Sequence, residues 1–136
     1  RGYGMIEIRS FTTTSGEKLV LVSETGGVPQ VTFHQNDLSV FTYTKNKKLI
    51  PSNKKVLPAI DETIFMKPGI PDSVKKFIMN NSNMAFDLSE EKLMLSLNSD
   101  YLLNNEVSRK WLKGDVVYFD WIKDRFVIGE IVNSLN

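Results

Sequence analysis

The chain has 136 residues, no cysteine, one histidine and a formal net charge of +1. The lack of cysteine excludes disulfides, thiolate chemistry and sulfur-ligated zinc. A hydrophobic fraction of 41% and a charged fraction of 24% are typical of a globular chain rather than a disordered one. This length predicts a single domain, which we place at residues 5–136, because residues 1–4 precede Met5 and are interpreted as a cloning remnant. No signal peptide and no apolar run of about 20 residues is present, so we expect a cytoplasmic protein that does not enter the membrane.

The first half of the chain is predicted to form β-strands. Residues 6–9 alternate apolar and polar side chains, which predicts that Ile6 and Ile8 face the core. Phe11 departs from this alternation, so the strand is expected to end or bulge near Ser10. Asn36-Asp37 predicts a turn. Further strands are expected over residues 18–22, 30–34 and 38–43.

The middle of the chain changes character. Residues 45–57 are rich in lysine and include two asparagines and one proline, which predicts an exposed loop. A short strand is expected next, with Ile64-Phe65-Met66 as its centre. Val74, Phe77 and Ile78 then share one side of a helix of about three turns.

Residues 84–97 allow two interpretations. Their alternating apolar side chains predict a hairpin turned at residues 89–91, whereas the same turn residues could instead begin a helix. The alternation favours the hairpin. A second helix is expected after it, with Leu103, Val107 and Trp111 on its buried face at four-residue spacing, and with Gly114 in the left-handed conformation that ends helices.

The last segment predicts a hairpin, with strands over residues 116–121 and 126–132 joined by a charged turn. Residues 114–132 begin Gly-Asp, continue as an apolar strand with a late tryptophan, and place an aromatic residue shortly before Gly129. In this they are similar to the hairpin of SH3-like small barrels of the Tudor and KOW type. In that family further strands follow the hairpin, so a barrel here would draw its other strands from upstream. The predicted fold is α+β, mostly antiparallel β-sheet or a small barrel, with two or three short helices.

Nothing in the sequence indicates a catalytic or metal site. His34 is the only histidine, lies at a non-core position of a predicted strand, and is accompanied by no nucleophile motif. Neighbouring acids such as Asp61-Glu62 point to opposite faces if the chain is extended there. We therefore predict no catalytic residue, no metal and no cofactor, and keep a carboxylate- or metal-dependent hydrolase as a third alternative.

Positive charge is concentrated in one segment. Five lysines and no acid lie between Asp37 and Asp61, among amides and hydroxyls that suit phosphate contacts. The other interpretation is a loop kept soluble by its charge. A second, weaker basic set lies near the final hairpin, where Tyr118 could stack on a base. Its members are Arg109, Lys110, Lys113, Lys123 and Arg125. The predicted nucleic-acid-binding residues are Lys45, Lys47, Lys48, Lys54, Lys55, Arg109, Lys110, Lys123, Arg125 and Tyr118.

These observations predict a non-enzymatic binding module that contacts nucleic acid, duplex DNA with little sequence specificity, through the lysine loop and the final hairpin. The alternative is a protein-interaction module of a phage or bacterial regulator. Abundant lysine and asparagine, typical of AT-rich genomes, suggest such a source. An exposed apolar patch beside an unpaired strand edge would favour this alternative. The sequence does not fix the oligomeric state or the strand order.

Overall fold

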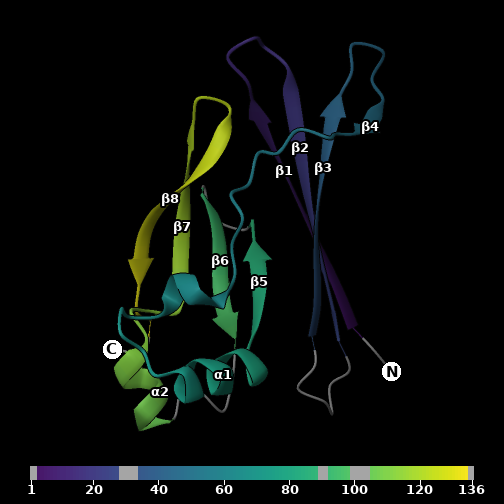
Figure 1. Cartoon of the computed structure of the whole chain (residues 1–136). Coiled ribbons are helices and arrows are strands. Elements are labelled where there is room, and N and C mark those ends of the chain that lie inside the picture. Colours follow the sequence, from purple (N-terminus) through teal and green to yellow (C-terminus); the bar gives the residue numbers. More distant parts are fainter. Residues whose placement is uncertain (1–2, 28–33, 89–91, 99–104, 135–136) are drawn as a thin grey trace.

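A computed structural model describes residues 3–27, 34–88, 92–98 and 105–134. Two four-stranded antiparallel sheets and three short helices make up this part of the chain (Figure 1). The N-terminal sheet has the order β1 (Tyr3–Thr12), β2 (Lys18–Gly27), β3 (His34–Tyr43) and β4 (Leu49–Pro51). The C-terminal sheet has the order β5 (Asn83–Asp87), β6 (Leu93–Asn98), β7 (Val116–Ile122) and β8 (Arg125–Val132). The helices are the 3₁₀-helix η1 (Glu62–Phe65), α1 (Asp72–Asn80) and α2 (Glu106–Trp111).

The prediction of a mostly antiparallel β fold with few helices is confirmed. The described strands do not close into a barrel, because each sheet keeps two edge strands of its own. The chain crosses once from sheet to sheet between β4 and β5, through η1 and α1 (Figure 1). None of the described helices combines the length and the apolar character that a membrane crossing requires.

The two sheets share one hydrophobic core. Leu19 and Leu21 of β2 are fully buried and contribute to it from the N-terminal sheet. The alternating apolar side chains of β6 and β7, such as Leu95 and Phe119, contribute from the C-terminal sheet. These alternating positions all point to one face of each sheet, so the core lies between the two inner faces.

The inner face of β1 is the reverse of the one predicted. Phe11 packs against the core and meets Phe126 with ring centroids 4.9 Å apart, whereas Ile6 and Ile8 are 63% and 66% exposed. Strand β1 also continues past Ser10 without a bulge. Alternation alone gives two possible faces, and the contact of Phe11 with the distant β8 decides between them.

Three further local predictions are wrong. Asn36-Asp37 lies inside β3, where cross-strand pairing with β2 overrides the turn preference of these residues. Residues 62–65 form η1 rather than a strand, because the Asp61 side chain accepts a hydrogen bond from the Thr63 backbone N–H at 2.9 Å and begins a helical turn. On α2, Val107 is 56% exposed and Ser108 is buried in its place.

Other predictions are confirmed or lie outside the described residues. Residues 84–97 do contain the two strands of a hairpin, β5 and β6, although its turn at 89–91 falls in a part that is not described. The final hairpin is present as β7 and β8. Most of the strand predicted over residues 30–34 also lies outside the described part.

The sheets meet at the free edge of β5. The Ser23 hydroxyl donates a hydrogen bond to the Phe86 carbonyl oxygen at 3.0 Å. The backbone N–H of Leu88 donates to a Glu7 carboxylate oxygen at 3.5 Å. Side chains of β1 and β2 therefore bind backbone groups along an edge that would otherwise be open.

Candidate functional site

Three turns come together at one end of the molecule. Strand pairing places the β1–β2 turn beside the β3–β4 turn, because Thr12, Lys18, Tyr43 and Leu49 are successive cross-strand neighbours. The β7–β8 turn joins them through Asp124, whose carboxylate accepts hydrogen bonds from the backbone N–H and the hydroxyl of Thr14, both at 2.7 Å. We call this surface the turn end and define it as residues 13–18, 44–55 and 122–125.

The turns are tight and hold lysine side chains at their tips. Lys47, Lys123 and Asp124 have positive φ angles of 60°, 51° and 67°. Two successive residues with positive φ between Ile122 and Arg125 are typical of a two-residue hairpin turn, where asparagine and glycine are usually preferred. Lysine at such a position costs conformational energy of about 1 kcal/mol. The structure therefore holds two lysines in unfavourable backbone conformations, one at the tip of the β3–β4 hairpin and one at the tip of the β7–β8 hairpin.

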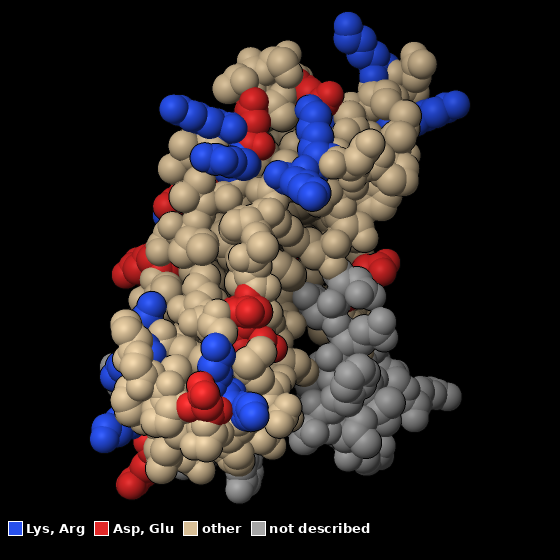
Figure 2. Space-filling model, in the orientation of Figure 1, with Lys and Arg blue, Asp and Glu red and all other residues tan. Residues whose placement is uncertain are grey.

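The turn end is strongly positive. Its residues include eight Lys or Arg and two carboxylates, whereas the rest of the chain has nine Lys or Arg and fourteen carboxylates. Both carboxylates of the turn end are engaged, since Glu17 forms an ion pair with Lys54 and Asp124 binds Thr14. Figure 2 shows basic side chains projecting from this end. The net charge of +1 thus conceals a marked separation of charge.

Seven of the ten predicted binding residues lie at or next to the turn end: Lys45, Lys47, Lys48, Lys54, Lys55, Lys123 and Arg125. Arg109 and Lys110 lie on α2, which precedes β7 and sits at the opposite end of the C-terminal sheet (Figure 1). There Lys110 lies over the Trp111 ring, 5.9 Å from its centroid. Tyr118 lies in the middle of β7 beside Met94 of β6, away from the turn. The structure therefore does not bring these three residues to the turn end.

Lys18 belongs to the turn end and was missed by the sequence analysis. It is exposed at the start of β2, next to Tyr43 of β3. The signal that could have found it is the run Ser15-Gly16-Glu17, which favours a turn, since Lys18 is the first residue after it. Without the strand order, this turn could not be placed beside the lysine segment.

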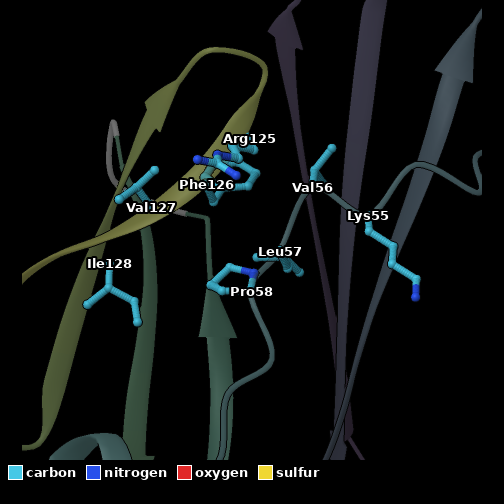
Figure 3. A pocket seen from close by; sticks show the side chains of 8 residues that line it. All are labelled: Lys55, Val56, Leu57, Pro58, Arg125, Phe126, Val127 and Ile128. Atoms are coloured by element: carbon cyan, nitrogen blue, oxygen red, sulfur yellow. The ribbon is translucent and has the colours of Figure 1, made fainter.

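A pocket of about 340 Å³ opens between the extended segment 55–58 and the start of β8. The two are held together by a hydrogen bond of 2.7 Å from the Phe126 backbone N–H to the Val56 carbonyl oxygen. Apart from Lys55 and Arg125 the lining side chains are apolar. In Figure 3 the Lys55 side chain extends away from Arg125, so the two cations do not converge on one bound group. The pocket therefore adds an apolar surface beside Arg125 rather than a binding site for a compact anion.

The described residues show no group of three or more histidine, cysteine or carboxylate side chains that could hold a metal ion. One pair of acids does meet, on the inner side of β1. Burial, together with the nearby Asp87 carboxylate, raises the pKa of Glu7 above its usual value of 4.5. His34 begins β3, and its side chain lies outside the described part of the structure.

Comparison of the chain with protein-family models, with curated proteins and with solved structures found no match in any of the three.

Proposed function

We propose that the chain is a non-enzymatic module that binds nucleic acid, duplex DNA with little sequence specificity, through its turn end. The observation that carries this proposal is the convergence of three hairpin turns with eight Lys or Arg side chains. The two carboxylates of the turn end are already bound within the protein. Binding would come from lysine and arginine side chains that displace counterions from the phosphate backbone.

The chemistry of the turn end favours phosphate contacts over base recognition. Lysine is a flexible point charge that positions a duplex without distinguishing bases, and bidentate base contacts usually come from arginine or amide side chains held on a helix. The turns present one arginine, Arg125, which is the first residue of β8 after the β7–β8 turn. We therefore propose weak sequence preference and a dissociation constant in the usual non-specific range of about 10⁻⁴ to 10⁻⁶ M at physiological salt.

The test is fluorescence anisotropy of labelled duplex DNA, single-stranded DNA and duplex RNA, each titrated with the protein at several salt concentrations. A variant with Lys47, Lys48, Lys54 and Lys55 changed to glutamine should bind every duplex more weakly. Its slope of log affinity against log salt should become shallower by roughly 0.9 for each phosphate that these lysines neutralise in the unmodified protein.

The matched control removes four cations from the opposite end of the molecule: Lys76, Arg109, Lys110 and Lys113. Because this variant has the same net charge as the first, a general charge effect would weaken both equally. Unchanged salt dependence in the control, with a reduced slope in the turn-end variant, supports the proposal. Equal weakening in the two variants, or no binding by the unmodified protein at low salt, would refute it.

A second candidate, a protein-interaction module, is favoured by a different observation. Ile6 and Ile8 are exposed on the outer face of β1, beside the edge of the N-terminal sheet. An apolar surface next to a strand edge is a common site for binding an added strand. Co-purification of one stoichiometric protein that resists nuclease treatment would favour this candidate over nucleic-acid binding.

A further inference from the structure

Strand β1 is a long, continuous edge strand. It has ten residues and, within the described part of the chain, pairs only with β2. Between Ile6 and Ser10 it contains no proline, no lysine and no bulge, three of the features that protect an edge from pairing. Two opposite charges, Glu7 and Arg9, alternate there with the exposed Ile6 and Ile8.

The turn fixes which backbone groups of β1 point outwards. The Thr13 backbone N–H donates to the Glu17 carbonyl oxygen at 2.8 Å, so residue 13 and the odd-numbered residues before it bond to β2. The even-numbered residues Gly4, Ile6, Ile8 and Ser10 then direct their N–H and C=O groups to the free edge. The carbonyl oxygen of Thr12 also points outwards and accepts a hydrogen bond of 3.3 Å from the Trp121 indole N–H. This contact closes the edge at Thr12 and leaves the stretch from Gly4 to Ser10 open.

A second copy of β1 fits this edge in one register. If two β1 strands pair antiparallel about a two-fold axis at Ile8, Glu7 of each copy lies opposite Arg9 of the other, and the outward groups of Ile6, Ile8 and Ser10 all find partners. The neighbouring registers that also satisfy the hydrogen bonds place either Glu7 opposite Glu7 or Arg9 opposite Arg9. Because like charges directly opposite each other destabilise a strand pair, the charges select the register centred on Ile8.

We propose that the chain forms a two-fold dimer in which β1 of one copy pairs antiparallel with β1 of a second copy, centred on Ile8, to make a continuous eight-stranded sheet. The side chains of Ile8 from the two copies would meet on the outer face, where each is 66% exposed in the single chain. On the inner face, Arg9 of the second copy would bring a positive charge to Glu7, which lies near the like-charged Asp87. The occupant of this edge is therefore a copy of the same chain, because the edge is complementary in charge to itself.

The test is sedimentation equilibrium over a range of protein concentrations. The unmodified chain should approach twice 15.5 kDa as its concentration rises. Ile8→Pro removes an outward N–H that β2 does not use, so this variant should fold and stay monomeric. The charge reversals Glu7→Arg and Arg9→Glu should each weaken self-association about tenfold or more, since each leaves like charges opposed.

Mixing the two reversed variants provides the decisive measurement. At positions 7 and 9, Arg9→Glu has two negative charges and Glu7→Arg has two positive charges. The two variants should therefore form a heterodimer, although each alone is monomeric. Lys76→Glu, on α1, serves as a control that should dimerise like the unmodified chain. A monomer at every concentration would overturn the proposal, as would a dimer that persists in Ile8→Pro and in both reversals. Circular dichroism reports whether Ile8→Pro folds, and the mixing experiment decides the matter if it does not.

Discussion

Replacing Gly114 with alanine should destabilise the fold, because the structure has no space for a side chain there. Gly114 lies just before β7, and a Cβ atom at this position would come 2.8 Å from the carbonyl carbon of Val132 and closer still to its oxygen. That oxygen accepts a hydrogen bond of 3.0 Å from the Asp115 backbone N–H. The end of β8 would therefore have to move away from β7 before the variant could fold.

The expected cost follows from these contacts. Overpacking of a close-packed site costs about 1–3 kcal/mol, and weakening the Asp115–Val132 hydrogen bond adds about 0.5–1.5 kcal/mol. The same movement would disturb the hydrogen bond of 2.7 Å from the Ser134 backbone N–H to the Asp115 carboxylate. We expect a decrease of about 2–4 kcal/mol in the free energy of unfolding, from a total of about 5–15 kcal/mol for a domain of this kind. For a chain of this length that corresponds to a fall in Tm of roughly 10 °C.

Urea denaturation followed by circular dichroism measures this decrease. Gly4→Ala is the matched control, because a Cβ atom there would meet nothing closer than the Thr25 carbonyl oxygen at 3.7 Å. The control should stay within about 0.5 kcal/mol of the unmodified protein. If Gly114→Ala also stayed within that range, the close approach of β7 and β8 at this point would not be a constraint on the fold, and the reasoning would fail.

Two further changes test electrostatics and helix capping. Because the pKa of Glu7 is raised by burial and by Asp87, the folded chain retains this proton at a higher pH than the unfolded chain does. The free energy of unfolding should therefore fall as pH rises from 4.5 through the folded pKa of Glu7, and Glu7→Gln should remove that fall. Urea denaturation of dilute protein across this pH interval measures both. If Glu7→Gln had the same pH profile as the unmodified protein, this assignment would be contradicted. Asn105 caps α2 by accepting hydrogen bonds from the backbone N–H groups of Val107 at 3.0 Å and Ser108 at 3.2 Å. Asn105→Ala should lower the free energy of unfolding by about 1 kcal/mol, and Asn105→Asp should preserve it.

The sequence predicted best those elements that local patterns determine. The β7–β8 hairpin was predictable because apolar runs rich in β-branched and aromatic residues flank a short charged turn, and both signals lie within a few residues of each other. The β5–β6 hairpin followed from the alternating apolar side chains of residues 84–97. In contrast, the buried face of β1 depends on Phe11 meeting Trp121 and Phe126, which are more than a hundred residues away. No local pattern contains that information.

Gly114 shows how a correct residue can be given the wrong role. A glycine after a basic helical segment is typical of a left-handed helix end. In the structure Gly114 is not among the glycines with positive φ, which in the described chain are Gly16 and Gly69. It is needed for close contact with Val132 instead. Sequence spacing cannot distinguish these two uses of glycine, because only the packed structure shows which atoms approach.

The candidate site was predictable in its parts but not in its assembly. The run from Lys45 to Lys55 stands out because no acid interrupts it. That Lys123 and Arg125 lie near it depends on the contact between Thr14 and Asp124, which joins the two sheets. The same tertiary arrangement removes Arg109 from the site, although it is close to Arg125 in the sequence.

The two proposed surfaces are connected through the β1–β2 hairpin, which contributes its outer edge to one and its turn to the other. Antiparallel pairing about Ile8 would place the turn ends of the two copies at opposite ends of the joined sheet. Thr14 is six residues from Ile8, so at about 3.4 Å per residue the two β1–β2 turns would be about 40 Å apart. Because the two strands run in opposite directions, the two turn ends would point away from each other and would face separate segments of DNA. Dimerisation through β1 would thus turn two weak phosphate-binding ends into a bivalent module that bridges two duplex segments. When both segments belong to one long DNA, the second contact becomes intramolecular and raises the affinity without any new base contact.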